Sequence, residues 1–286
     1  YLSNATILTP NAVPLGSMQY ILNVSDANGC KGRDTMEIQV QGIRPIISAY
    51  PERDTVCIGE QVHLYANASP QPCGITATAS NVPAVNKIIG TGNMVNSFFS
   101  PFYRDGFSGY RAQYLIRADE LIAAGMSPGN IKGMTLNVQS APSNGPTADS
   151  LLGLKIKLGC TPLTSLSTTT GFIPGLSNVF TANKFAPVLG SNVINFPISS
   201  EYFWDGKSNL VVEFCYNLPQ FSGGNPAPVF STITSYNSSL VDQDYNTAGC
   251  QLSGSTASFY AAESSLRPNF KFFFAKTNTF GYKWAP

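Results

Sequence analysis

Residues 18–41 read MQYILNVSDANGCKGRDTMEIQVQ, and this stretch indicates the fold class. Its first half places apolar residues at every second position, namely Met18, Tyr20, Leu22 and Val24. Alternation with a period of two is typical of a β-strand with one buried face. Residues 26–29 form a turn, because Asn and Gly tolerate positive φ, and a second alternating run follows with Met36, Ile38 and Val40. The stretch therefore predicts a β-hairpin.

The rest of the chain also consists of strand-like runs joined by turns. Its 286 residues include 25 Gly and 20 Pro, which is typical of a turn-rich β protein. Residues 117–124 have apolar positions at helical spacing and end at Gly125, a residue common at helix C-termini. Further strands are predicted at residues 46–50, 62–66, 134–138, 152–158, 193–198, 210–216, 229–233 and 270–274. We therefore predict an all-β protein with one short helix.

The charge balance excludes several classes of partner. The chain has 17 Lys and Arg against 16 Asp and Glu, so its formal net charge is +1, and only 12% of its residues are charged. Nucleic-acid binding requires a basic stripe, whereas these cations are scattered. The longest apolar runs, such as residues 194–198 and 270–275, fall far short of the roughly 20 residues that span a bilayer. We expect a globular protein that does not bind nucleic acid and does not insert into a membrane.

The cysteines predict an oxidising environment. They are even in number and include no CxxC or CxH pair of the kind that binds metal: Cys30, Cys57, Cys73, Cys160, Cys215 and Cys250. Because lysine is sparse and most polar residues are uncharged, we predict disulfides, an extracellular location, and no metal or cofactor. The alternative is buried free thiols in a cytosolic protein. Since the sequence starts at Tyr1 without a leader, we expect a mature or excised fragment whose export signal lies outside it.

The two ends of the chain each predict only part of a sandwich. Residues 1–42 contain strands of the kind that end an immunoglobulin-type sandwich, without the strands that begin it. Residues 43–69 contain strands that begin such a sandwich, on either side of a turn at Cys57, and residues 277–286 supply one aromatic strand. Together these segments are somewhat shorter than the roughly 100 residues of an immunoglobulin-type sandwich. Residues 70–276 have strands of their own. We therefore predict one sandwich cut between its strands, with a second, larger sandwich inserted into it.

Four short pieces of the terminal segments resemble consecutive pieces of a known repeat. They are TVCIGE at residues 55–60, YKWAP at 282–286, YLSN at 1–4, and the hairpin from Tyr20 that ends in DANGC at 26–30. In this order they are similar to the PKD-like, immunoglobulin-type repeats of very large surface proteins of Bacteroidota. In the repeat family, the YLSN-like and DANGC-like pieces follow the other two, whereas in this chain they stand at the N-terminus. The resemblance therefore implies one period of an array in which a neighbouring copy completes each sandwich.

Residues 70–276 resemble a jelly-roll-like module of proteins exported by the type IX secretion route. The resemblance depends on YLIRADEL at residues 114–121, LGCT at 158–161 and FWDGKSNLVVE at 203–213. Together the two resemblances imply a PKD-like β-sandwich with an inserted jelly-roll-like β-sandwich. The insertion itself departs from the usual pattern of the repeat family.

The resemblances imply a structural and adhesive role and not an enzyme. The chain would be one repeat unit of a secreted cell-surface filament or giant adhesin, of the kind involved in attachment and gliding motility, with neighbouring copies as partners. The alternative is a carbohydrate-binding module that holds surface glycans on exposed aromatic residues. The repeat pattern also places the Cys57 turn opposite the Cys30 hairpin, so that Cys57 of one copy would bond Cys30 of the next. Within the insert we predict the pairs Cys215–Cys250 and Cys73–Cys160.

No motif in the sequence supports catalysis. The single histidine, His63, lies between apolar neighbours on the opposite face of a predicted strand, so we expect a polar surface residue. The Gly-rich stretches 90–92, 106–109 and 175–177 match neither a phosphate-binding loop nor a nucleophile elbow.

Two acidic groups need separate consideration. Glycoside hydrolysis needs two facing carboxylates, and Glu201, Asp205 and Glu213 form the nearest cluster of acids in the sequence. We favour a structural role instead, in which Asp205 binds local backbone N–H groups in a tight turn with Trp204 packed below it. The pair in Asp242-Gln243-Asp244 has the oxygen ligands that Ca²⁺ prefers but lacks the rest of a loop pattern.

The aromatic residues and three hydroxyl-bearing residues are candidate surface sites. Aromatic residues could form a glycan platform or fill the core, and we favour the core: Phe98, Phe99, Phe102, Tyr103, Tyr110 and Tyr114, together with Phe270, Phe272 and Phe274. Thr35, Thr55 and Ser150, each preceded by Asp and followed by an apolar residue, resemble the short O-glycosylation acceptor of Bacteroidota.

Overall fold

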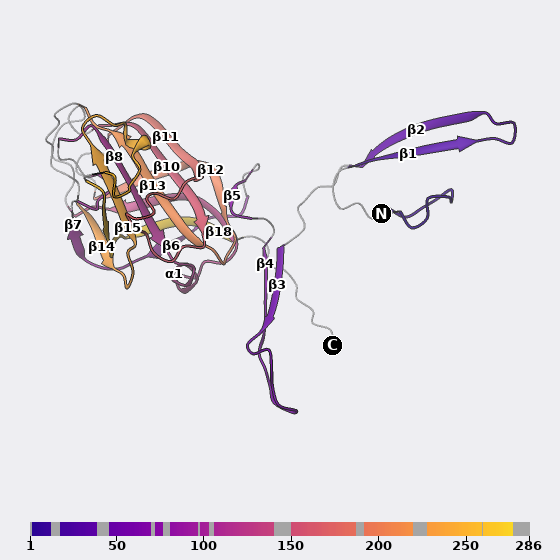
Figure 1. Ribbon diagram of the computed structural model, residues 1–286, viewed down its shortest axis with the longest axis horizontal. Helices are drawn as coiled ribbons and strands as arrows, with labels where there is room; N and C mark the ends of the chain where they lie inside the picture. Colours follow the sequence, from indigo (N-terminus) through magenta and orange to yellow (C-terminus); the bar gives the residue numbers. More distant parts are fainter. Residues whose placement is uncertain are drawn as a thin grey trace. The chain divides into compact units, whose positions relative to one another are not determined.

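A computed structural model of the chain describes residues 2–12, 18–38, 46–69, 72–76, 81–96, 98–102, 106–139, 150–186, 192–219, 228–258 and 260–276. The chain divides into two units, Tyr1–Gln71 and Pro72–Pro286 (Figure 1), and we treat each by itself. This division lies close to the predicted start of the insert at residue 70. The predicted strand at residues 277–286 lies outside the described residues.

Unit 1 contains two antiparallel hairpins. The first pairs β1 (Met18–Ser25) with β2 (Lys31–Ile38), and the second pairs β3 (Ile46–Pro51) with β4 (Leu64–Ser69). These hairpins confirm the strands predicted on both sides of the Asp26 and Cys57 turns. Within the described residues each hairpin forms a two-stranded sheet of its own. Because an isolated two-stranded hairpin is at best marginally stable in water, each one needs a further sheet to pack against.

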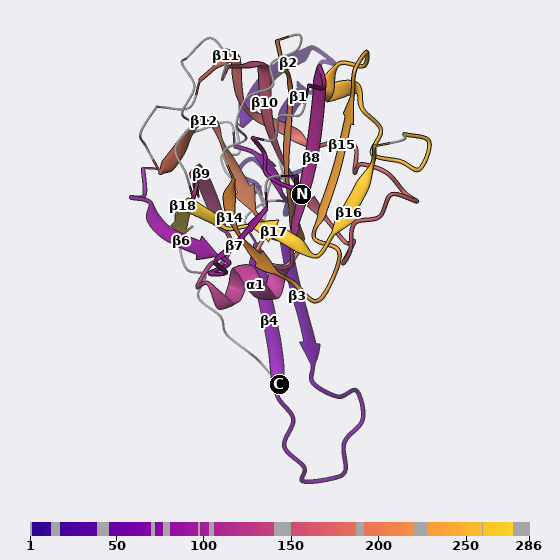
Figure 2. The same ribbon diagram turned by 90° about the vertical axis from the view of Figure 1, so that its left-hand side faces the viewer.

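Unit 2 is built from two large antiparallel sheets and a small one. Their strand orders are β11-β10-β13-β8-β15-β16, β5-β12-β9-β18-β6 and β17-β14-β7. Figures 1 and 2 show the two large sheets facing each other. The strands are β5 (Gly74–Ile75), β6 (Val85–Ile89), β7 (Met94–Asn96), β8 (Gly109–Ile116), β9 (Gly129–Asn137), β10 (Leu151–Thr161), β11 (Ser177–Phe185), β12 (Val193–Trp204), β13 (Asn209–Asn217), β14 (Val229–Ile233), β15 (Ser239–Asp244), β16 (Ala262–Ser264), β17 (Leu266–Pro268) and β18 (Phe270–Lys276).

The chain is therefore all-β, as predicted, and unit 2 has a sandwich-like architecture. Eight of its strands form antiparallel pairs that are nested in the manner of a jelly roll, namely β6 with β18, β8 with β13, β9 with β12 and β10 with β11. The further pairs β9–β18 and β10–β13 join these strands into the two large sheets.

The main core lies between the two large sheets. Strand β8 directs alternate side chains into it, and so does β18, in which Phe270, Phe272 and Phe274 are at most 1% exposed. This confirms the predicted role of the three in-step phenylalanines. The core is completed by Met134, Leu136, Ile156, Phe196, Trp204, Val212 and Phe214, among others.

The outer face of the six-stranded sheet is buried as well. Leu115, Val211 and Leu240 point away from the main core and pack against Leu166, Phe172 and Leu252, which come from loops. Strands buried on both faces need apolar side chains at successive positions. This explains why β13 reads NLVVEFCYN and does not alternate.

Helix α1 (Ala118–Ala123) ends at the predicted position. The N–H of Arg117 donates to Glu120 Oε1 (3.1 Å), and the N–H of Ala118 donates to Asn209 Oδ1 (2.8 Å), so the first turn is capped. Gly125 has a φ of 77°, which favours glycine and terminates the helix. Leu121 is fully buried, whereas Ile122, the other large apolar residue of the predicted helix, is 53% exposed.

A buried ion pair connects this helix to β17 of the three-stranded sheet. Arg267 is 0% exposed, and its guanidinium donates to both carboxylate oxygens of Glu120 (2.9 and 2.7 Å), to the carbonyl of Leu115 and to the hydroxyl of Tyr236. Burial alone would raise the pKa of Glu120, but the hydrogen bonds and the charge of Arg267 outweigh burial and lower that pKa. The carboxylate is therefore stabilised in its charged form.

We expect Glu120→Gln to lower the free energy of unfolding by about 2–3 kcal/mol at neutral pH, because it leaves the buried Arg267 without its counterion. A carboxyl whose pKa is lowered by folding stabilises the fold above its unfolded pKa, and this contribution disappears as the pH falls through its folded pKa. The difference in the free energy of unfolding between wild type and Glu120→Gln should therefore become smaller below about pH 4.5. Urea unfolding at a series of pH values measures this difference.

The matched control is Asp119→Asn, on the same helix turn but exposed, for which we expect a loss below about 1 kcal/mol. A wild-type advantage over Glu120→Gln that stayed constant down to pH 3 would contradict the assigned ion pair.

Candidate functional site

The hairpin β1–β2 presents one apolar face. Directly opposed residues of an antiparallel pair share a face, and the register places Tyr20 opposite Met36 and Leu22 opposite Asp34. Leu22 is 60% exposed, Val24 57% and Met36 63%. We expected this face to be half-buried, and the difference arises because no second sheet covers it in the described part of the chain. The face is therefore available to a partner.

The hairpin β3–β4 has a similar uncovered side. Its register places Ala49 opposite Ala66 and Pro51 opposite Leu64, and Leu64 is 53% exposed. The loop between the strands adds Ile58, which is fully exposed. His63 is exposed as predicted, and its carbonyl accepts a hydrogen bond from the N–H of Glu52 (2.8 Å).

Each hairpin carries one exposed free cysteine in an ordered turn. At the first turn, Asp26 Oδ1 accepts from the N–H of Cys30 (2.8 Å), and the N–H of Asp26 donates to the carbonyl of Cys30 (3.0 Å). Gly29 adopts a φ of 85° there, which explains the Asn-Gly pair. These contacts fix the backbone that presents the Cys30 thiol.

The Cys57 turn is built in the same way. The N–H of Cys57 donates to Glu60 Oε2 (3.1 Å), the N–H of Glu60 donates to the carbonyl of Cys57 (3.0 Å), and Arg53 forms an ion pair with Glu60 (2.7 Å). Gly59 has a φ of 82°. Two exposed thiols on preformed turns can form disulfides with an incoming thiol. The predicted Cys57–Cys30 bond between copies involves a second molecule and stays a prediction.

The other four cysteines form the two disulfides predicted within the insert. Cys73 bonds Cys160, which ties the segment around β5 to β10, and Cys215 bonds Cys250, which ties β13 to the short helix η1 (Gly249–Gln251). Two disulfides indicate a non-reducing, extracellular environment.

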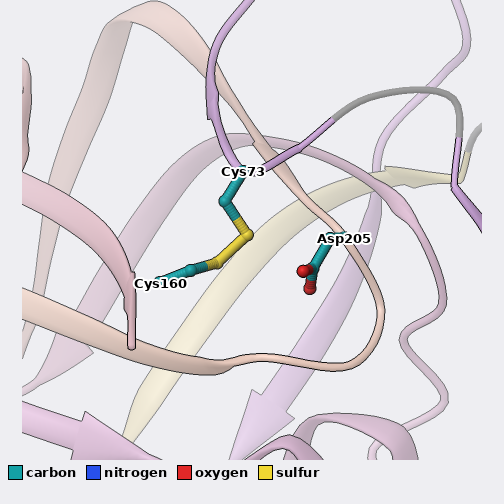
Figure 3. Close-up of side chains that lie close together, drawn as sticks. All are labelled: Cys73, Cys160 and Asp205. Carbon is teal, nitrogen blue, oxygen red and sulfur yellow. A yellow bond between two sulfur atoms is a disulfide. The ribbon is translucent and has the colours of Figure 1, made fainter. Parts of the chain in front are cut away.

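Asp205 lies beside one of these disulfides. Its carboxylate and the sulfurs of Cys73 and Cys160 all lie within 4.8 Å of one another, but the sulfurs are bonded together (Figure 3), so neither is a thiolate ligand. Asp205 Oδ1 accepts from the N–H groups of Lys207 (3.0 Å) and Ser208 (2.9 Å). Trp204 is buried beneath this turn, as predicted, and its Nε1 donates to the carbonyl of Ser208 (2.8 Å).

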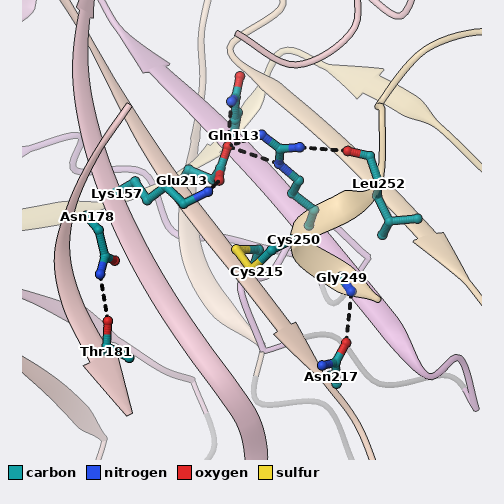
Figure 4. The surroundings of a disulfide bond; sticks show 11 residues. Gln113, Lys157, Asn178, Thr181, Glu213, Cys215, Asn217, Gly249, Cys250 and Leu252 are labelled. Carbon is teal, nitrogen blue, oxygen red and sulfur yellow. Dashed lines mark hydrogen bonds and ion pairs between the residues drawn. A yellow bond between two sulfur atoms is a disulfide. The ribbon is translucent and has the colours of Figure 1, made fainter. Parts of the chain in front are cut away.

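Glu213 is the centre of a buried charged cluster that sequence reasoning missed (Figure 4). It is 0% exposed; its Oε2 accepts from Arg111 (2.8 and 3.0 Å) and Gln113 (2.7 Å), and its Oε1 accepts from Lys157 (2.7 Å). The available signal was a single acid within the apolar run LVVEFCY. With two cations and an amide bound, this carboxylate is placed to hold the outer layer together and not to act on a substrate.

The remaining predicted acids have structural partners as well. Glu201 pairs with Lys132 (3.2 Å) and accepts from Asn130 Nδ2 (2.9 Å). Asp242 is 0% exposed and accepts from the N–H of Gly254 (2.9 Å) and the hydroxyl of Ser258 (2.5 Å). The N–H groups of Asn246 and Thr247 lower the pKa of Asp244. These contacts hold loops in place and do not favour a Ca²⁺ site.

The proposed aromatic platform is mostly interior. Tyr110 is 2% exposed and Tyr114 0%, and their hydroxyls donate to the carbonyls of Ser100 and Phe99 (both 2.9 Å). Burial raises the pKa of Tyr114 well above its usual value. Phe102 is also buried, and Tyr103 lies outside the described residues. For Tyr110, Tyr114 and Phe102 the core interpretation is confirmed.

The three glycosylation candidates differ in accessibility. Thr35 on β2 and Thr55 in the β3–β4 loop are exposed. Ser150 is 1% exposed, so the prediction at this residue is wrong for the folded protein, because a glycosyltransferase cannot reach a buried hydroxyl. Asp149, which carried half of the motif there, lies outside the described residues.

No protein-family model, curated protein or solved structure matches the chain. Among the described helices, none has both the length and the apolar character needed to cross a membrane. The resemblance to PKD-like repeats of Bacteroidota therefore stays a prediction, and the two exposed hairpins are the candidate functional site.

We expect Glu213→Gln to lower the free energy of unfolding by about 3–5 kcal/mol, because Arg111 and Lys157 would lose their shared buried counterion. Urea unfolding followed by tryptophan fluorescence measures the loss. Glu37→Gln on the exposed face of β2 is the control and should change stability by less than about 0.5 kcal/mol. Equal stability of the two variants would argue against the cluster.

We expect the double change Cys215→Ala and Cys250→Ala to lower the free energy of unfolding by about 2–4 kcal/mol, since the disulfide restricts the unfolded chain. Non-reducing urea unfolding compares it with wild type. Cys30→Ala serves as the control, because Cys30 is exposed and free and should leave unit 2 unaffected. A double variant as stable as wild type would show that the bond contributes nothing.

Proposed function

We propose that this chain is a structural and adhesive repeat unit of a secreted cell-surface filament or giant adhesin, and not an enzyme. Neighbouring copies join by completing PKD-like sandwiches across their boundary. Unit 1 supplies the joining surfaces, and unit 2 is a larger, jelly-roll-like module carried by each copy. The partner of each chain is another copy of the same chain.

The single observation that carries this proposal is the uncovered apolar face of β1–β2. Leu22, Val24 and Met36 are all more than half exposed on that face. Fully burying such a side chain contributes about 1.5–3 kcal/mol, so covering three of them to the extent that they are now exposed contributes on the order of several kcal/mol. A hairpin whose apolar face is left uncovered by the described part of its own chain is suited to dock on a second sheet.

The two free cysteines support the same arrangement. Cys30 and Cys57 are exposed, and each lies in a turn next to an uncovered hairpin. In an oxidising environment, already indicated by the two disulfides of unit 2, thiols brought together by docking would be oxidised. A Cys57–Cys30 bond between copies would then link the filament covalently along its length.

The test uses two full-length variants. Cys57→Ala retains only the Cys30 thiol, and Cys30→Ala retains only the Cys57 thiol. We expect an equimolar mixture, oxidised with glutathione disulfide, to form mixed Cys30–Cys57 dimers well above the half that random pairing yields. Labelling one variant with ¹⁵N and analysing dimers by mass spectrometry under non-reducing conditions measures this fraction.

The control places a thiol where no docking is expected. Thr181→Cys, an exposed position on β11, in a chain that also has Cys30→Ala and Cys57→Ala, should show no preference for the Cys30 thiol. Random proportions of dimers in the main experiment, or an intrachain Cys30–Cys57 bond in the wild-type monomer, would contradict assembly through these hairpins.

A further inference from the structure

A cleft of about 250 Å³ lies on unit 2, remote in sequence from both hairpins. It is bordered by the outer face of the five-stranded sheet and by β14 of the small sheet. The residues that line it and that matter here are Ile88, Thr91, Thr135, Asn137, Phe230 and Lys271. Sequence reasoning did not find it, because these residues come from four strands and one turn.

The floor of the cleft is set by strand register. Lys271 on β18 lies opposite Thr135 on β9 and opposite Ile88 on β6. Opposed residues share a face, and the flanking Phe270 and Phe272 point into the core. Ile88, Lys271 and Thr135 therefore form a row across the outer face of the sheet.

One wall is the Gly90-Thr91-Gly92 turn, which is held rigidly. The N–H of Gly92 donates to Thr232 Oγ1 (2.8 Å), Thr232 Oγ1 donates to Asn269 Oδ1 (2.7 Å), and Asn269 Nδ2 donates to the carbonyl of Gly92 (2.7 Å). A Cβ on Gly92 would lie 2.3 Å from the carbonyl oxygen of Ser231, so only glycine allows this approach. The glycines of this stretch serve to build a preformed wall.

Two polar groups at the floor have unmet capacity among the described residues: the Thr135 hydroxyl makes no hydrogen bond, and the Lys271 ammonium, which lies 6.0 Å from the centre of the Phe273 ring, has no anionic partner. Thr135 is 2% exposed, and its Oγ1 has no hydrogen-bond partner in the described structure. A buried hydroxyl left unsatisfied costs about 1–3 kcal/mol, so such groups need an explanation. The neighbouring Lys271 ammonium forms no ion pair with any described carboxylate. An unsatisfied hydroxyl beside a cation without an anionic partner fits a ligand that has both hydroxyl groups and a negative charge.

We propose that this cleft binds a uronate, a sugar unit with a carboxylate group. Lys271 pairs with the carboxylate, and Thr135 and Asn137 bind ring hydroxyls. Ile88, which is 59% exposed, and the partly buried Phe230 pack against the apolar face of the ring. The cleft is smaller than the 300–1,000 Å³ typical of drug-sized ligands, so it takes one sugar unit at a time. The site is independent of the hairpin assembly proposed above, and either can fail without the other.

The test is a titration of the ¹⁵N-labelled full chain with D-glucuronate, D-glucose and acetate. We expect glucuronate to shift the amide signals of residues 90–92, with glucose and acetate each binding at least tenfold more weakly. Lys271→Met should weaken glucuronate binding at least tenfold, since a hydrogen bond between charged groups is lost. Thr135→Val, which replaces the hydroxyl by a methyl group, should weaken it about threefold to tenfold.

Matched controls are Lys184→Met and Thr181→Val, both exposed on β11 of the other sheet, which should leave glucuronate binding unchanged. Urea unfolding confirms that each variant folds. It also gives a second readout, because without ligand Thr135→Val should be at least as stable as wild type once the unsatisfied hydroxyl is removed.

Four outcomes would overturn the proposal. Absence of glucuronate-induced shifts up to 50 mM would remove the site altogether. Equal binding of acetate and glucuronate would reduce it to a carboxylate contact, and equal binding of glucose would remove the role of Lys271. A folded Thr135→Val variant with unchanged glucuronate affinity would remove the role of the hydroxyl.

Discussion

A β-sheet with one apolar face must bury that face, and this constraint separates the two units of the chain. Unit 2 satisfies it internally: its two large sheets cover each other, and loops cover the outer face of the six-stranded sheet through Leu166, Phe172 and Leu252. In unit 1 the two hairpins form separate two-stranded sheets, and Leu22, Val24 and Met36 remain exposed. The proposed assembly of copies follows from this difference, because a second sheet is what those residues lack.

The loops that cover the outer face of the six-stranded sheet bury polar groups, and paired charges offset the free-energy cost of this burial. Loops that cover a sheet bring polar backbone with them, and buried polar groups must be hydrogen-bonded. Glu213 binds Arg111, Gln113 and Lys157, and Arg111 in turn donates to the carbonyl of Leu252 in a covering loop (2.7 Å). Asp242 similarly holds Gly254 and Ser258. The acids that a search for catalytic pairs would select are thus the groups that attach the loops to the sheet.

The two proposals for this protein concern different surfaces and different physics. Assembly through the hairpins depends on apolar burial and on thiols presented by ordered turns, in which Asp26 and Glu60 fix the backbone of Cys30 and Cys57. Binding in the cleft depends on a few polar groups placed by strand register on a rigid sheet. A surface protein that both polymerises and holds acidic sugars would attach a filament to glycans through many weak sites, and repetition of a weak site raises the overall strength of attachment.

Local patterns in the sequence were sufficient for the strands that were predicted, the turns and the helix end, but they did not reveal β6, β8, β11 or β15. The alternation in residues 18–24, the Asn-Gly turn before Cys30 and Gly125 after α1 each reflect a preference of a few neighbouring residues, and the structure agrees with them. Strand pairing was less accessible, since β9 joins β12 and β18 through contacts between residues far apart in the sequence. Residues whose role depends on such pairing escaped prediction, including Glu213, Thr135 and Lys271, while Ser150 was misjudged because its motif says nothing about burial.

The sequence by itself determined the all-β class, the hairpin turns that present Cys30 and Cys57, and the in-step phenylalanines of β18, because each depends on local conformational preference and a period of two. Only the tertiary structure decided which faces are covered, that Glu213 is shared by two cations, and that Thr135 lies beside Lys271 at the floor of a cleft. These depend on which strands lie side by side, and that is set by packing over the whole unit and not by any short stretch of residues.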